Sequence, residues 1–190
     1  LVSDLIPETI TVGMLQRVMQ NLLKDRIAVR DLPHIIEALA DYAHRTKNIN
    51  LLTELSRKSL ARCITDRYLS PDGRIIAIAL DPALEHALTG YLKPDGEETV
   101  CAMPPDMAIA LTKKLASAWQ GAMQQGHENV VLLCDSRLRA PLANIMSRSL
   151  HRLPVVAYDE IVVGVEIVPV ETISIAEANA GELPQLAQVV

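Results

Sequence analysis

The feature that most constrains the fold is a change in hydrophobic period at the S-P-D-G turn of residues 70–73. Before this turn, apolar residues such as Leu15, Met19 and Leu22 recur every three or four positions, which places them on one face of a helix. After it, residues 75–80 form a continuous apolar run bounded by turn residues, which is the pattern of a buried strand. The sequence therefore predicts a helical part followed by a part that contains a sheet.

The helical part, predicted over residues 1–70, contains three helices. The first begins after Thr11 and the second after Asp31, because both side chains can cap a helix. The third spans about residues 51–68. The residues expected to face the core from the last two helices are Ile35, Ile36, Leu39, Ala43, Leu51, Leu52, Leu55, Cys63 and Ile64.

The second part alternates short apolar runs with helical patterns. Four strands are predicted near residues 75–80, 130–134, 154–158 and 165–172, and helices lie between the first three. Such alternation is typical of an α/β layer with mostly parallel pairing. The predicted fold class is therefore mixed α and α/β. An all-helical subdomain (1–70) precedes a small α/β subdomain (71–172) with a mostly parallel sheet of about four strands, and residues 173–190 form a flexible tail.

Several kinds of chemistry lack their motifs in this sequence. There is no G-x-x-x-x-G-K-[ST] or G-x-G-x-x-G loop, and the three cysteines and five histidines are dispersed. We therefore predict no cofactor, no metal and no catalytic residue. A net charge of −5 and an aromatic content of 3% argue against nucleic acid as a partner.

Two alternatives remain open. The first is an enzyme with Cys134 as nucleophile, because this thiol ends a strand just before a helix N-terminus, where the dipole lowers a thiol pKa. The second is a module for an anionic partner, either an acidic protein or nucleic acid, on the basic segment that includes Arg137, Arg139 and Arg148. These three arginines are the candidates for partner docking.

A charged stripe repeats every four residues along the third predicted helix: Glu54, Lys58, Arg62 and Asp66. Its pairs of opposite charge can each support the helix by a few tenths of a kcal/mol. The middle pair, Lys58 and Arg62, is like-charged and would gain from a carboxylate of another molecule. This leaves room for a subunit interface at Lys58 and Arg62.

Six segments resemble one family, and they occur in that family's order. They read Q-N-L-L-K-D-R-I-A-V-R-D-L (20–32), I-I-E-A-L-A-D-Y-A (35–43), L-L-T-E-L-S-R-K-S-L-A-R (51–62), L-D-P-A-L-E (80–85), V-V-L-L-C-D-S-R-L-R (130–139) and P-V-V-A-Y-D-E-I (154–161). Together they resemble the cytoplasmic domain of the FlhA/SctV family of type III secretion export gates, flagellar and virulence-related. The resemblance reaches to about residue 172.

This resemblance implies a non-enzymatic role. It implies a parent protein with several inner-membrane helices and a cytosolic region of four subdomains, of which this chain resembles the last two. The cytosolic regions would form a homo-oligomeric, nonameric ring at the cytoplasmic face of the bacterial inner membrane. Chaperone–substrate complexes would dock there and pass to the export channel, with the ATPase complex and other export-apparatus proteins as further partners.

The helical subdomain of relatives contributes to contacts within the ring. The charged residues on the matching segment are therefore candidates for the subunit interface: Arg26, Arg30, Asp31, Glu37 and Asp41. Lys58 and Arg62 of the charged stripe join them.

Overall fold

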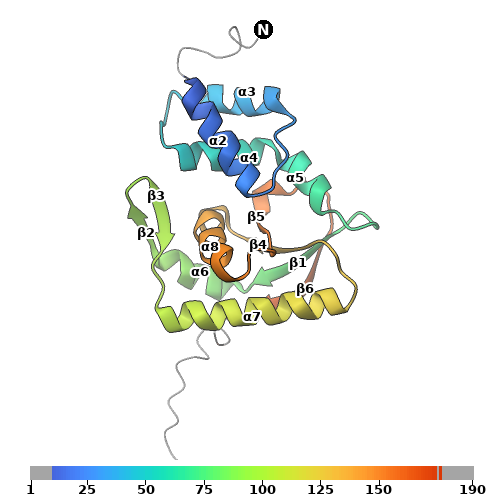
Figure 1. Cartoon of the computed structure of the whole chain (residues 1–190). Helices are drawn as coiled ribbons and strands as arrows, with labels where there is room; N and C mark the ends of the chain where they lie inside the picture. The colour runs from blue at the N-terminus through green and yellow to red at the C-terminus, as the bar shows by residue number, and fades with distance from the viewer. Residues whose placement is uncertain (1–9, 175, 177–190) are drawn as a thin grey trace, which may run out of the picture.

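The computed structural model describes residues 10–174 and residue 176. Its first part is helical, with α2 (Val12–Lys24), α3 (Leu32–Tyr42), α4 (Ile49–Ser59) and α5 (Ala61–Tyr68). These four helices lie together on one side of the sheet (Figure 1). The predicted tail lies almost wholly outside the described residues.

Capping explains where the first helices begin. The Met14 backbone N–H donates to Thr11 Oγ1 at 3.1 Å, which confirms the predicted cap of α2. Asp31 stands at the N-cap position of α3 but its side chain makes no capping hydrogen bond. Its Oδ1 lies instead 2.6 Å from His34 Nδ1. The expected start of α3 is correct, although the expected capping bond is replaced by a side-chain pair.

The single helix expected over residues 51–68 is two helices. Leu60, at φ −90° and ψ 15°, separates α4 from α5 and is buried. The expected inward face is also partly wrong, because Leu51 is 48% exposed whereas Ser56 and Arg57 are buried. The inner face of α4 is polar because it meets charged groups of the second part, as described below.

The second part is the predicted α/β layer. Its elements are β1 (Ile75–Leu80), α6 (Pro82–Gly90), β2 (Leu92–Asp95), β3 (Glu98–Cys101), α7 (Pro105–Gln124), β4 (Val130–Cys134), α8 (Ser136–Ser149), β5 (Val155–Ala157), the short 3-10 helix η1 (Tyr158–Glu160) and β6 (Ile167–Ile173). The main sheet has the order β5-β4-β1-β6, and every neighbouring pair is parallel. The predicted four-stranded parallel sheet is confirmed.

The β2–β3 hairpin was not expected. No strand was predicted between residues 80 and 130, but residues 92–95 and 98–101 form an antiparallel pair in which Asp95 faces Glu98. Gly96, at φ 61°, begins the two-residue loop, a conformation that glycine adopts without a steric penalty. The hairpin touches the helical part, since Asn48 Nδ2 donates to the Glu97 carbonyl at 2.6 Å.

Alternation along the strands gives the sheet two buried faces. Ile76, Ile78 and Leu132 point to the face covered by α6, α7 and α8. Ile75, Ala77, Val131, Leu133 and Val156 point to the opposite face and pack with apolar residues of the four N-terminal helices. Figure 1 shows the resulting layers, with α2–α5 on one side of the strands and α7 on the other. The two parts therefore share a core across the turn at residues 70–73.

Candidate functional site

Five charged side chains form a network where the two parts meet. Arg57 of α4, only 2% exposed, donates to both carboxylate oxygens of Glu160, at 2.5 Å from Nε and 2.8 Å from Nη2. Its Nη1 also lies 2.8 Å from Asp25 Oδ2. Arg57 therefore joins α4 to the residue that follows α2 and to η1 of the α/β part.

Arg139 of α8 extends the network in the opposite direction. It donates to the two oxygens of Glu54, each at 2.5 Å, and to Asp25 Oδ2 at 2.9 Å. Asp25 thus accepts from both arginines. The contacts of Arg57 with Glu160 and of Arg139 with Glu54 are bidentate, the geometry in which arginine binds carboxylates most strongly.

Backbone groups complete the surroundings of Glu160. The Ala157 N–H donates to Glu160 Oε2 at 3.0 Å, and the Thr65 hydroxyl donates to the Glu160 carbonyl at 3.2 Å. The Val162 N–H donates to the same hydroxyl at 3.0 Å. Within the described residues, no buried side-chain nitrogen or oxygen lacks a hydrogen-bond partner. A buried ion pair tolerates desolvation only when its remaining polar atoms are satisfied, and this one meets that condition.

The network shifts the pKa of two of its members. Burial disfavours the charged form of Arg57, but the hydrogen bonds and charge of Glu160 outweigh it and raise the pKa of Arg57. Burial raises the pKa of Glu54, and the neighbouring Arg139 lowers it only in part. Three carboxylates face two guanidinium groups, so the cluster has one surplus negative charge when all are ionised.

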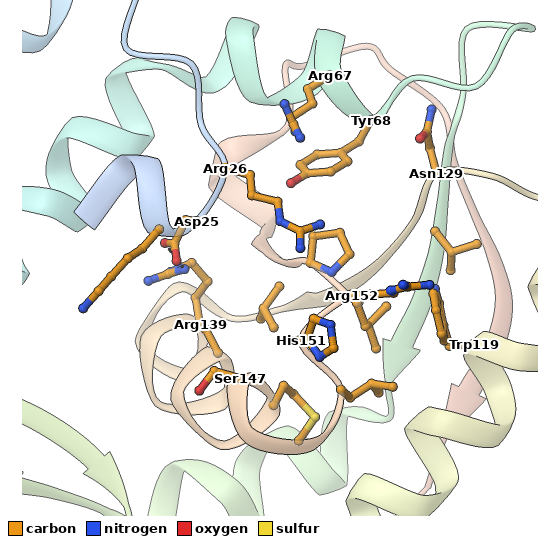
Figure 2. A pocket seen from close by; sticks show the side chains of 18 of the residues that line it. Asp25, Arg26, Arg67, Tyr68, Trp119, Asn129, Arg139, Ser147, His151 and Arg152 are labelled. Carbon is orange, nitrogen blue, oxygen red and sulfur yellow. Dashed lines mark hydrogen bonds and ion pairs between the residues drawn. The ribbon is translucent and has the colours of Figure 1, made fainter. Parts of the chain in front are cut away.

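Next to this network lies a cleft of about 520 Å³. Its walls come from both parts. Besides Arg57 and Arg139 of the network, five of its lining residues are basic: Lys24, Arg26, Arg67, His151 and Arg152. Figure 2 shows Arg26, Arg67, His151 and Arg152 around the opening, with Arg139 and Asp25 at one end. Trp119, the only tryptophan of the chain, lines the cleft from α7.

The structure separates the predicted docking arginines. Arg137 and Arg148 are exposed, and Arg137 pairs with Asp135 at 2.9 Å. Arg139 is only 5% exposed and is engaged by Glu54 and Asp25. Its guanidinium is therefore unavailable for a partner protein, and the docking prediction remains for Arg137 and Arg148.

The predicted subunit-interface residues lie on the helical part. Arg26, Arg30, Glu37, Asp41, Lys58 and Arg62 are exposed, and Asp31 is half-buried. Lys58 lies 3.3 Å from Asp159 of the α/β part. The predicted charged stripe is interrupted, because Glu54 turns inward to Arg139 and the break at Leu60 separates Lys58 from Arg62.

The environment of Cys134 does not suit a nucleophile. The thiol is fully buried at the end of β4, and burial, followed by the Glu85 carboxylate, raises its pKa. Catalytic cysteines need a lowered pKa and access to substrate. In residues 10–174 and 176, moreover, no group of three His, Cys, Asp or Glu side chains is arranged to hold a metal ion.

The sequence interpretation missed Asp25, Arg57 and Glu160. One signal was available, since Ser56 and Arg57 stand where the apolar period of α4 predicts inward positions. A buried arginine requires a carboxylate, but its main partner lies 103 positions away. No local pattern identifies Glu160 as that partner.

Together, the fold and the network define a two-part module in which a helical unit is fixed by ion pairs to a small parallel α/β unit. The model of the FHIPEP family matches residues 1–166, and the chain belongs to this family. The resemblance to the C-terminal cytoplasmic domain of the FlhA/SctV proteins is confirmed. The chain is a type III secretion or flagellar export component of this family.

Individual relatives agree with this assignment. The chain is 34% identical over 178 residues to the flagellar biosynthesis protein FlhA of Yersinia enterocolitica, a match that covers 93% of this chain and 25% of the relative. Its fold resembles CdsV of Chlamydia pneumoniae (TM-score 0.79, 24% identity, covering 90% of this chain and 48% of that one). It also resembles the nonameric EPEC SctV-C (TM-score 0.79, 18% identity, covering 90% and 51%).

The chain spans about a quarter of the length of the curated relatives that it matches, at 26% and 25% for the first two. Among the described residues, no helix is both long enough and apolar enough to cross a bilayer.

Proposed function

We propose that this chain forms part of the cytosolic platform of a type III export gate. The platform assembles with copies of itself into a ring, docks chaperone–substrate complexes and passes them to the export channel without catalysis of its own. The observation that carries the proposal is the family match over residues 1–166. The buried, protonated state favoured for Cys134 supports the non-catalytic role.

The fold of a nonameric relative supports self-assembly. The SctV-C structure is described as nonameric, and CdsV has also been solved in a complex with CdsO. We extend both points to this chain. It associates with copies of itself and with another export-apparatus protein at the cytoplasmic face of the inner membrane.

The ion-pair network suits such a role mechanically. The Arg57–Glu160, Arg139–Glu54 and Arg139–Asp25 pairs join the helical unit to the α/β unit, so we expect the two to move as one body. A ring subunit with a rigid body transmits a contact on one unit to the other without an internal hinge. The exposed charges of the helical unit, including Glu37 and Arg62, are then free to meet a neighbouring copy.

The proposal is tested in the full-length parent protein. Glu37→Lys and Arg62→Glu should each reduce both ring formation, seen by electron microscopy of the purified cytosolic region, and export of substrates into the medium. Arg17→Glu is the matched control, because Arg17 is an exposed arginine of α2 outside the predicted interface. A parent protein that lacks the matched segment yet still forms rings and exports substrate would contradict the proposal.

A further inference from the structure

The cleft beside the network has more positive charge than its own groups neutralise. Lys24, Arg26 and Arg67 reach it from the helical unit, while His151 and Arg152 follow α8. Within the part of the chain that the structure describes, these five side chains have no acidic partner at ion-pair distance. Arg67 stacks on Tyr68, with 5.7 Å between its guanidinium carbon and the ring centre.

The acidic residues that line the cleft do not offset this charge. Asp25 is already shared by Arg57 and Arg139. Glu128 is the other acidic lining residue among those described, and it is exposed. The cleft is therefore a region of positive potential in a chain whose net charge is −5.

The cleft also has apolar surface. Met146, Leu150 and Val155 contribute to its lining, together with the rings of Tyr68 and Trp119. An occupant that combines carboxylates with apolar side chains complements both features. A flat anionic membrane surface cannot follow a concave wall, and the acidic balance of the whole chain opposes nucleic acid.

Arg26 lines the cleft from a strained backbone conformation. Its φ of 60° makes it the only non-glycine residue with positive φ in the described chain. Glycine adopts this conformation without the steric clash that the Cβ atom of arginine makes with the backbone. Figure 2 shows the Arg26 side chain extending into the space between Tyr68 and His151. A strained position that holds a charged side chain in a cleft is a sign of a binding role.

We propose that this cleft, walled by Lys24, Arg26, Arg67, His151 and Arg152, binds an acidic peptide segment of a partner protein in which Asp or Glu alternates with apolar residues. The inference rests on the docking role proposed above and gives it a location and a chemistry. The carboxylates of the segment would pair with the cations of both walls, and its apolar side chains would contact the ring of Trp119 and the lining near Met146.

The experiment uses the purified 190-residue chain and a short synthetic peptide in which Glu and Leu alternate. Because Trp119 is the only tryptophan and lines the cleft, its intrinsic fluorescence reports occupancy directly. Fluorescence anisotropy of the labelled peptide gives the dissociation constant independently. Binding should weaken several-fold as NaCl rises from about 0.05 M to about 0.5 M, since salt screens exposed charges. The same peptide with Gln in place of Glu should not bind.

Charge reversal locates the site. Arg67→Glu combined with Arg152→Glu should weaken peptide binding by about tenfold or more, because like charges then oppose the carboxylates. The matched control combines Arg17→Glu with Lys113→Glu, which changes the net charge equally at exposed positions outside the cleft. The control should bind as the wild type does. Thermal melts followed by circular dichroism verify that both double variants fold, and Arg152→Gln alone is the milder substitute.

Three results would overturn the inference. They are equal loss of binding in the cleft variant and the control, an unchanged Trp119 signal at saturating peptide, and preference for single-stranded DNA or for anionic lipid vesicles over the peptide. If a cleft variant binds no peptide but forms rings and supports export, the result supports the cleft as the peptide site and leaves the proposed platform function intact. Failure of the wild-type cytosolic region to form rings would instead contradict the proposed platform function.

Discussion

The carboxylate of Glu160 accepts two hydrogen bonds from Arg57, 2.5 and 2.8 Å long, across 103 positions of the sequence. Both side chains are only 2–3% exposed, so each depends on the other for neutralisation. This pair and the shared carboxylate of Asp25 fix how the helical unit sits on the sheet.

Removal of the Glu160 charge should strongly destabilise the protein. Glu160→Gln leaves Arg57 buried without its main counter-charge, and breaking a buried pair in this way costs about 3–5 kcal/mol. Urea denaturation, with the free energy of unfolding extrapolated to water, measures the loss. The adjacent Asp159→Asn is the control, because its pair with Lys58 is exposed and should contribute less than about 1 kcal/mol. Equal losses for the two variants would remove the special role of the Arg57–Glu160 pair.

The titration of Glu54 should be visible in the pH dependence of stability. Burial raises the pKa of Glu54 above its ordinary value of 4.5. A carboxyl group with a higher pKa in the folded state binds more protons when folded, so its contribution to stability falls as pH rises above 4.5. Glu54→Gln removes this titration. The free energy of unfolding of the variant, relative to that of the wild type, should therefore increase from about pH 4.5 to about pH 7. Denaturation curves at several pH values test this, and a difference that does not vary with pH would contradict it.

Alkylation should pass over Cys134 in the native protein. Its thiol is buried and its pKa is raised, whereas Cys63 and Cys101 are partly exposed. Burial also raises the pKa of Cys101, so Cys63 should react first with iodoacetamide. Peptide mass spectrometry after a short exposure at neutral pH gives the order of labelling. Full labelling in urea is the positive control. Rapid and selective labelling of Cys134 would revive the enzyme hypothesis.

A glycine at position 26 should stabilise the fold. Arg26→Gly relieves the left-handed backbone at φ 60° and should raise the free energy of unfolding by about 0.5–1 kcal/mol, despite the added freedom of the unfolded chain. Arg30→Gly, in the same connection but without positive φ, should lower it by about 0.5–1 kcal/mol. Differential scanning calorimetry compares them. Destabilisation by both substitutions would mean that the Arg26 side chain makes stabilising contacts that outweigh the strain.

Local patterns predicted much of this fold. The apolar runs at β1 and β4 predict buried strands, and Thr11 predicts a helix start, because strands and caps depend on neighbours within a few residues. Asp81 begins α6 in the same way, since its Oδ1 accepts from the Ala83 and Leu84 N–H groups. Parallel order also followed for β1, β4 and β5, since helices separate these strands along the chain.

The candidate site could not be predicted in the same way. Arg139 was expected to meet a partner protein, because arginine is usually exposed and its carboxylate partner Glu54 lies 85 positions away. The inward face of α4 was expected to be apolar, and only the position of Glu160 explains why it is not. Interactions between distant segments determine these positions, and no local pattern in the sequence identifies such interactions.

The position of Glu160 has a consequence for biosynthesis. A nascent chain leaves the ribosome N-terminus first, so Arg57 emerges long before its partner Glu160 does. Until η1 has been translated, the four N-terminal helices expose both an unsatisfied guanidinium and the apolar residues that later cover the sheet. The final arrangement of this chain can therefore form only after residue 160 has been translated, and until then the exposed apolar residues favour aggregation.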